Sequence, residues 1–359
     1  MLNLIDTALK SPLARVLAWP HSPESYLELL APKVGGKAIK ATVKAVRQET
    51  GRAVSLVLQP NHRWAGHVPG QYVSLTATLN GRRHTRCFTI SGLEAGCPVV
   101  TIQAHEGGVV STWANESVWV GDSVELDAAA GDFVLPAQRP ERLLLIAGGS
   151  GITPVKALLD QLVAEHYSGK ADILYYVPTA QDAIFGESLK ALAATHPNFR
   201  LHLVTTRAAG GKLQGHFSAD HLQAIGADLG TTAAYVCGPA GLIDAVVQHW
   251  DDAGHSTRLT LERFQAARLP LVAGGEALPI SFSDSSITTT APGRTLLEAA
   301  EGAGLNPTSG CRQGICRTCT CRKLSGQVRD IRTGELSGTG EEDIAICVTV
   351  PVTAVSIEL

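Results

Sequence analysis

Apolar residues occupy alternate positions from Ile39 to Ala45, with polar residues between them. This period of two is typical of a strand with one buried face. Val54, Leu56 and Leu58 repeat the pattern, and short β-rich runs follow near positions 72, 86 and 100, separated by Gly and Pro. Many short strands broken in this way favour a small antiparallel barrel, which we expect over residues 37–138.

The pattern changes to α/β over residues 139–270. Leu143–Ala147 is a continuous apolar run, as expected for a strand buried on both faces. A glycine turn follows, and Pro154 then opens a helix, where a missing N–H costs nothing. Further strands near positions 173, 201 and 234 alternate with helices near positions 189 and 243. This order predicts a parallel sheet wrapped by helices.

Two less regular segments flank these units. Four prolines interrupt residues 1–36, which we interpret as an N-terminal extension, and residues 271–278 contain glycines and are interpreted as a linker. A third unit is expected over residues 279–359, beginning with a strand near Ile280. Thr295 and Glu298 then have the spacing of a capping box at the start of a helix.

Length and charge narrow the class of protein. A chain of 359 residues is long enough for two or three domains, and a net charge of −3 does not favour nucleic-acid binding. No apolar stretch approaches the roughly 20 residues of a membrane span. The N-terminus lacks the residue order of a secretory signal. We therefore expect a cytoplasmic protein with no membrane span and no nucleic-acid partner.

Five of the eight cysteines lie in the last fifth of the chain. Cys311, Cys316, Cys319 and Cys347 have the C-x4-C-x2-C…C spacing of plant-type [2Fe–2S] proteins. We predict that these four hold a cluster; the alternative is a structural zinc site, which more often has two separate C-x2-C pairs. Cys321 is interpreted as a small buried residue, with exchange of the ligand role with Cys319 as the alternative.

A glycine-rich turn joins the first α/β strand to its helix, and it reads Gly148-Gly149-Ser150-Gly151-Ile152-Thr153-Pro154. Glycines let the backbone approach a pyrophosphate, and the N-terminus of the helix favours its charge. The alternative is a turn with only a structural role.

This turn, together with Cys237-Gly238-Pro239, resembles the NAD(P) domain of the ferredoxin–NADP reductase superfamily. In the barrel, Arg86-Cys87-Phe88-Thr89 resembles that family's Arg-x-aromatic-Ser/Thr flavin motif, and Gly107-Gly108-Val109-Val110-Ser111 resembles its second flavin segment. The resemblance extends from Lys37 to Leu359. It implies a multidomain protein: an antiparallel β-barrel flavin domain, an α/β parallel-sheet nicotinamide domain and a β-grasp [2Fe–2S] ferredoxin domain.

The resemblance also implies roles for these residues. Arg86 would pair with the flavin phosphate, Phe88 would lie against the flavin in place of the usual Tyr, and Thr89 would bond near flavin N5. Gly107 to Ser111 would hold a pyrophosphate, which favours FAD over FMN. Gly149, Ser150, Gly151, Thr153, Gly238 and Pro239 would bind the nicotinamide dinucleotide. Cys237 would lie near the nicotinamide and, with Thr89, is a candidate catalytic residue.

The predicted activity is hydride transfer from NADPH to FAD, followed by transfer of single electrons through the cluster to a partner protein. The chain looks most like the electron-transfer partners of bacterial fatty-acid desaturases, on the basis of Tyr26–Leu29 and Arg83–Cys87. A membrane-bound desaturase is therefore the expected partner, which would place the protein at the membrane surface. The alternative is the reductase component of an aromatic-ring or alkane oxygenase that uses NADH.

Charged residues bear on cofactor and partner choice. Thr206-Arg207 resembles the superfamily's contact to the 2′-phosphate and favours NADPH, although Pro178–Gln181 carries no charge. The alternative for Arg207 is a solvated loop charge. A basic rim around the cluster would suit an acidic partner, unless its charges are merely solvated; it comprises Arg312, Arg317, Arg322 and Lys323.

Overall fold

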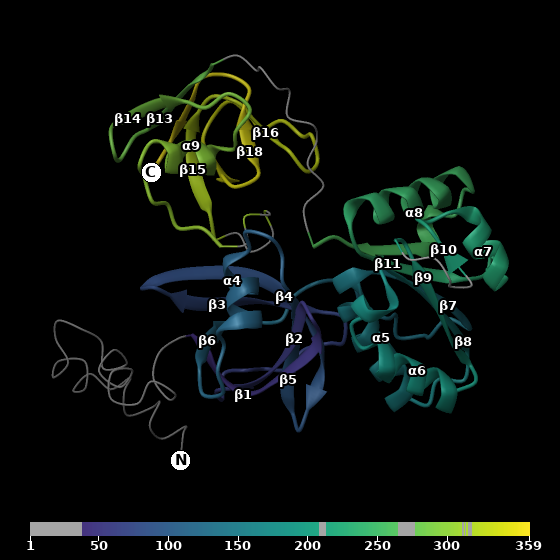
Figure 1. Cartoon of the computed structure of the whole chain (residues 1–359). Coiled ribbons are helices and arrows are strands. Elements are labelled where there is room, and N and C mark those ends of the chain that lie inside the picture. The colour runs from purple at the N-terminus through teal and green to yellow at the C-terminus, as the bar shows by residue number, and fades with distance from the viewer. Residues whose placement is uncertain (1–37, 208–212, 265–276, 311, 313, 315–317) are drawn as a thin grey trace.

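The computed structural model describes residues 38–207, 213–264, 277–310, 312, 314 and 318–359. The predicted N-terminal extension and most of the predicted linker lie outside these residues. Figure 1 shows three units in chain order: a barrel, an α/β unit beside it, and a smaller C-terminal unit. None of the helices in the described ranges is both long and apolar enough to cross a membrane.

The first unit is a closed antiparallel barrel with the strand order β1-β2-β5-β4-β3-β6. Its elements are β1 Ile39–Thr50, β2 Ala53–Pro60, β3 Tyr72–Leu79, β4 Arg82–Glu94, β5 Cys97–Gln103, α4 Val109–Glu116 and β6 Ser123–Leu126. Ala41 and Val43 point into the barrel core, as the alternating pattern predicts, and α4 adds Val110 and Ala114 to that core. The predicted barrel is confirmed.

The second unit is a parallel sheet with the strand order β10-β9-β8-β7-β11-β12. Its strands are β7 Arg142–Gly148, β8 Lys170–Val177, β9 Phe199–Thr205, β10 Leu213–Gln214, β11 Ala233–Cys237 and β12 Leu259–Glu262. Its helices are η1 Gly149–Gly151, α5 Ile152–Ala164, η2 Ala180–Asp182, α6 Gly186–Thr195, α7 Ala219–Ile225, α8 Ala240–Asp252 and η3 Ser256–Arg258. The strand order reverses between β7 and β11, and ligands of open α/β sheets bind at such a point.

The C-terminal unit combines a mixed sheet, in the order β14-β13-β19-β15-β17, with a two-stranded sheet of β16 and β18. Its elements are β13 Pro279–Phe282, β14 Ile287–Thr290, α9 Leu296–Gly302, β15 Thr320–Ser325, β16 Val328–Asp330, β17 Glu342–Ala345, β18 Thr349–Pro351 and β19 Val355–Ile357. The capping box is confirmed: Thr295 accepts a hydrogen bond from the Glu298 amide, and Glu298 accepts one from the Thr295 amide. The predicted multidomain fold is thus present.

Candidate functional site

Three neighbouring cavities lie where the barrel meets the α/β unit. One of about 230 Å³ opens on β4, β5 and the start of α4. A second, of about 210 Å³, lies at the carboxyl ends of β7 and β11, and a third, of about 320 Å³, lies between β4 and β12. Phe264 lines all three. A ligand in one cavity can therefore approach a ligand in the next.

The cavity beside β4 contains most of the predicted flavin residues. Its lining includes Arg86, Phe88, Thr89, Gly108, Val110 and Ser111. Thr89 is only 3% exposed, and its Oγ1 has no hydrogen-bond partner within the described part of the chain. A buried hydroxyl without a partner costs free energy, so this oxygen is suited to a polar atom of a bound ligand. The residues fit a flavin on this ground.

The turn before α4 lines the same cavity through Gly108. Gly107 has a φ of +71°, and a Cβ on Gly108 would lie 2.3 Å from Ser111 Oγ. The Ser111 hydroxyl donates to the Gly108 carbonyl at 3.1 Å and accepts from the His105 amide at 3.3 Å. Ser111 therefore stabilises the turn, while N–H groups in the first turn of a helix lack intrahelical partners and can bind phosphate oxygens.

Arg86 lies at the border between the flavin cavity and the C-terminal unit. Its Nη1 donates to the Thr85 carbonyl at 2.7 Å and to the Gly310 carbonyl at 3.4 Å. Gly310 directly precedes Cys311, the first predicted cluster ligand. The flavin cavity and the start of the cluster loop are therefore neighbours, as electron transfer between them requires.

Glycines line the cavity at the ends of β7 and β11. Its lining includes Gly148, Gly149, Ser150, Gly238 and Pro239. A Cβ on Gly148 would lie 2.7 Å from Leu242 and Pro239 atoms, so the two strand ends approach closely. Thr153 Oγ1 donates to the Ser150 carbonyl at 2.9 Å and stabilises the turn. Exposed backbone at a helix start suits a pyrophosphate, so this cavity fits a nicotinamide dinucleotide.

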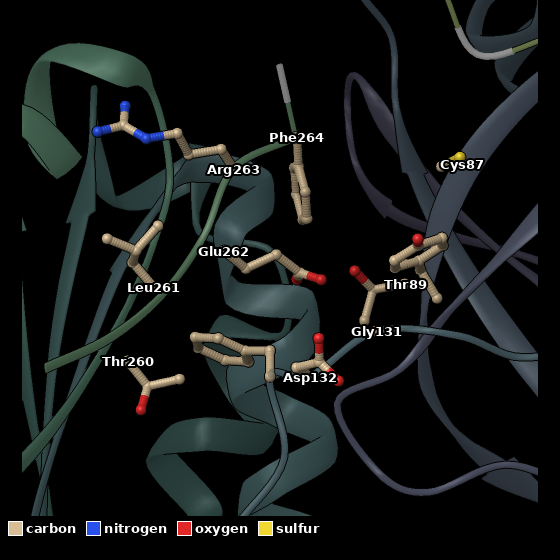
Figure 2. Close-up of a pocket in the computed structure, with 11 residues that line it drawn as sticks. Cys87, Thr89, Gly131, Asp132, Thr260, Leu261, Glu262, Arg263 and Phe264 are labelled. Atoms are coloured by element: carbon tan, nitrogen blue, oxygen red, sulfur yellow. The ribbon is translucent and has the colours of Figure 1, made fainter. Parts of the chain in front are cut away.

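Glu262 lines the cavity between β4 and β12 and lies close to Cys237. Figure 2 shows the Glu262 side chain pointing across the cavity toward the strand that carries Thr89, while Arg263 points away. Cys237 is fully buried below the cavity surface, with Sγ 4.0 Å from a Glu262 carboxylate oxygen. Burial raises the pKa of Glu262 to about 8, and burial and the nearby Glu262 raise that of the Cys237 thiol. The carboxyl group is therefore largely protonated at neutral pH and can donate a hydrogen bond.

The sequence analysis did not identify Glu262, Arg263 and Phe264. Glu262 ends β12, the last strand of the α/β unit, and Arg263 and Phe264 follow it. The three residues have no recognisable spacing from a glycine turn or a cysteine. Their proximity to Thr89 depends on the packing of β12 beside β11 and on the position of the barrel. The sequence analysis predicted no strand at Leu259–Glu262, so it could not place these residues at the carboxyl edge of the sheet.

We expect the free energy of unfolding to fall as pH rises from about 5 to about 8, in part because of Glu262. Its ordinary pKa of 4.5 rises to about 8 in the folded chain, so between these values the folded state binds a proton that the unfolded state has released. Each pH unit in this window should remove up to about 1.4 kcal/mol. Glu262→Gln should remove this contribution, as urea denaturation at several pH values would measure.

Glu187→Gln is the matched control, because that carboxylate is on the surface, with 92% of its side chain exposed. It should retain the pH dependence of the wild-type chain. A Glu262→Gln variant with the same dependence as the wild type would show that Glu262 is ionised in the folded protein at neutral pH.

The cysteine site is described in part. Cys319 and Cys347 are both buried in the core of the C-terminal unit, with exposed fractions of 2% and 3%. Cys319 precedes β15 and Cys347 follows β17, and these two strands pair with each other. The Gly314 amide donates to Cys347 Sγ at 3.3 Å. Cys311 and Cys316 lie outside the described residues. Two buried sulfurs, one of which receives an amide N–H, fit a [2Fe–2S] cluster.

The predicted basic rim is not a free positive surface. Arg312 forms an ion pair with Glu301, and Arg322 forms one with Glu341. Lys323 is fully buried, where its Nζ donates to the Gly338 carbonyl at 3.1 Å and lies 3.1 Å from Glu342. Arg317 lies outside the described residues. The prediction of an exposed rim charge is therefore wrong for Lys323, which is buried. The charges of Arg312 and Arg322 are offset by neighbouring carboxylates.

Together, the fold and the cavities define a nicotinamide-dependent flavoprotein reductase with its own iron–sulfur domain. Residues 145–248 match the family described as "Oxidoreductase NAD-binding domain", and residues 281–352 match "2Fe-2S iron-sulfur cluster binding domain". The chain is 33% identical to an "NADPH oxidoreductase" of Mycobacterium tuberculosis over 348 residues, which cover 95% of this chain and 90% of that protein.

Two further relatives align over most of this chain. A "Glycine betaine monooxygenase reductase subunit" of Chromohalobacter salexigens is 27% identical over 81% of this chain and 86% of its own. The structure of phthalate dioxygenase reductase aligns with a TM-score of 0.60 at 22% identity, covering 90% of this chain and 98% of that one. The chain belongs to the ferredoxin–NADP reductase superfamily of oxidoreductases, as a member with a C-terminal [2Fe–2S] domain. Its cofactors are FAD, a [2Fe–2S] cluster and a nicotinamide dinucleotide.

Proposed function

We propose that this chain is the reductase component that supplies electrons from NADPH to a separate oxygenase. The observation that supports it most directly is the meeting of the three cavities at Phe264, with the flavin cavity extending to Arg86 beside the cluster loop. When bound, FAD accepts a hydride and the cluster carries single electrons, which together convert a two-electron donor into a one-electron source.

The side chains would orient the reactants. Gly148, Gly149, Ser150 and Gly238 would hold the dinucleotide pyrophosphate so that the nicotinamide reaches the cavity between β4 and β12. There, protonated Glu262 can donate a hydrogen bond to the nicotinamide amide, and Thr89 Oγ1 can donate to the flavin ring. Close, aligned approach of the two rings accounts for much of the rate of such a transfer.

An oxygenase is a better-supported acceptor than a fatty-acid desaturase. A relative of matching length is a monooxygenase reductase subunit. The desaturase hypothesis relied on Tyr26–Leu29, which lies outside the described residues, and on Arg83–Cys87. In that run Arg83 pairs with Glu125 at 2.7 Å within the barrel, and Arg86 lines the flavin cavity. Arg83 and Arg86 thus have roles in the barrel and at the flavin cavity that do not depend on the identity of the acceptor.

Two features of the nucleotide site favour NADPH. Arg207 follows β9 at the carboxyl edge of the sheet, where its amide donates to the Pro178 carbonyl at 3.0 Å. An acidic side chain that accepts from the ribose 2′-hydroxyl is typical of NAD sites. Asp182 instead accepts from the amide and the hydroxyl of Thr179, at 3.0 and 2.7 Å. The Asp182 carboxylate is therefore already hydrogen-bonded in the capping box of η2. Arg207, in contrast, is exposed and can pair with a 2′-phosphate.

Arg207→Ala should raise the KM for NADPH by about tenfold while leaving the KM for NADH nearly unchanged, because one charge-assisted contact contributes about 1.5 kcal/mol or more. Steady-state ferricyanide reduction with each nucleotide would measure both constants. Arg258→Ala is the matched control, because Arg258 precedes β12 at the opposite edge of the sheet. Equal effects on the KM values of the two nucleotides would contradict a contact between Arg207 and the 2′-phosphate.

Anaerobic titration of the purified chain with NADPH, and separately with NADH, tests the proposed function. We expect bleaching of the flavin absorption together with a rhombic [2Fe–2S] signal in EPR. Addition of a purified oxygenase component should then give product in proportion to NADPH, whereas membranes that contain a desaturase should not. Flavin bleaching without the EPR signal would contradict the proposal that electrons leave the protein through the [2Fe–2S] cluster.

A further inference from the structure

Arg332 connects the cluster loop to the two-stranded sheet. Its Nη1 donates to the Gly314 carbonyl at 2.9 Å. The same guanidinium holds Asp330 through Nε at 3.0 Å and Nη2 at 2.6 Å, and the Arg332 amide also donates to Asp330 at 2.8 Å. A planar fork with several donors can make such contacts at once, which a lysine ammonium cannot.

Gly314 is where this network meets a cluster ligand. Its amide donates to Cys347 Sγ at 3.3 Å while its carbonyl accepts from Arg332, so both peptide groups that flank its Cα are held. Gly314 has a φ of +72°, and a Cβ there would lie 2.5 Å from Arg332 Nη1 and 2.8 Å from Val348 Cγ2. Arg332 is therefore packed directly against Gly314, at a position where only glycine fits.

The other end of the network is fastened beside the same cysteine. Asp330 ends β16, which pairs with β18, and the Ile331 amide donates to the Val348 carbonyl at 2.9 Å. Val348 is the residue after Cys347. Arg332 is therefore fixed relative to the Cys347 sulfur, and through its contact with Gly314 it fixes the donor of that sulfur as well.

We propose that Arg332, held by Asp330, is a positioning residue that sets the reduction potential of the cluster through the Gly314–Cys347 hydrogen bond. An N–H donated to a cluster thiolate stabilises the reduced, more negative cluster more than the oxidised one, and so raises the potential. Without Arg332, Gly314 regains the conformational freedom of glycine, and its N–H is no longer held in the direction of the Cys347 sulfur. Because Asp330 offsets the arginine charge, the effect operates through geometry and not through net charge.

The test is an EPR-monitored redox titration of the FAD-loaded chain, which needs no electron acceptor and no turnover. In Arg332→Gln, the equilibrium between reduced flavin and reduced cluster should shift against the cluster by about tenfold, which is about 59 mV for a one-electron couple. Arg332→Lys should shift it in the same direction, because a single ammonium cannot reproduce the fork. Arg329→Gln is the matched control: it removes a positive charge from the exposed face of β16 without touching Gly314.

An unchanged potential in Arg332→Gln, or an equal shift in Arg329→Gln, would overturn the proposal. If Arg332→Gln retains FAD but is isolated without a cluster, Asp330→Asn is the second test. This variant removes the carboxylate that holds the guanidinium but still allows Arg332 to contact the Gly314 carbonyl. A lowered reduction potential of the cluster in Asp330→Asn supports the proposal, and an unchanged potential refutes it. The inference rests on the proposed function only for the presence of the cluster. A wild-type chain with no EPR signal would defeat that function, whereas a normal wild-type signal with unaltered variants would defeat the role of Arg332 alone.

Discussion

Replacement of Cys319 by serine should leave the chain without its [2Fe–2S] absorption, whereas the Cys321→Ser variant should keep it. Cys319 is 2% exposed and directly precedes β15, whose partner strand β17 ends two residues before Cys347. Cys321 lies within β15, where it pairs with Ile344 and is partly buried. A hydroxyl replaces a soft thiolate poorly at iron–sulfur sites, so loss of one of four ligands should remove most of the bound iron.

Visible absorption and iron content of the two purified variants would measure this effect, and FAD content would serve as the control for folding of the barrel. Burial and the neighbouring Cys319 raise the pKa of the Cys321 thiol. Cluster loss in Cys321→Ser, with a normal cluster in Cys319→Ser, would reverse the ligand assignment.

The parts of the fold that were predictable are those with local periodicity. The alternation from Ile39 to Ala45 gave β1, and the apolar run from Leu143 to Ala147 gave β7, because burial on one face or on two faces leaves a readable pattern. Short helices with few buried residues have a weaker hydrophobic periodicity and are harder to predict from the sequence. The sequence analysis did not anticipate α4, for example, which buries only Val110, Ser111 and Ala114.

The candidate site was predictable only where its residues are adjacent in sequence. Arg86 to Thr89 and Gly148 to Thr153 form continuous motifs. Arg86 to Thr89 line one cavity, and Gly148, Gly149, Ser150 and Thr153 line that cavity or the neighbouring one. Glu262 reaches Cys237 across 25 positions, and Arg332 reaches Gly314 across 18. Contacts of this kind depend on strand order and packing, which no spacing rule encodes.

Charge was the least predictable property for the same reason. The basic residues near the cluster were interpreted as a rim because they are close in sequence. Their partners Glu301 and Glu341 are 11 and 19 positions away, and they come beside the cations only in the folded chain. Exposed pairs of this type contribute little to stability, but they cancel the local field that would steer a charged partner. A count of sequence charges therefore overestimates the electrostatic attraction at this surface.

Gly151→Ala should weaken binding of the nicotinamide dinucleotide by at least about tenfold. The φ of Gly151 is −62°, which any residue adopts, so it is space that requires glycine here. A Cβ would lie 2.1 Å from the Cys237 carbonyl oxygen and 2.7 Å from the Gly238 nitrogen, both backbone atoms that cannot rotate away. The ends of β7 and β11 would have to separate, which should cost about 1–3 kcal/mol of stability and deform the glycine cavity between them.

The KM for NADPH should rise by at least about tenfold, the factor that corresponds to 1.4 kcal/mol of lost binding, and thermal unfolding should occur at a lower temperature. Ferricyanide reduction and calorimetry would measure the two effects. Gly241→Ala is the matched control, because a Cβ at this position in α8 meets nothing within 4 Å and alanine favours the helix. If Gly151→Ala bound NADPH as the wild type does, the close approach of the two strand ends would not be what shapes the site, and the dinucleotide would have to lie elsewhere on the sheet.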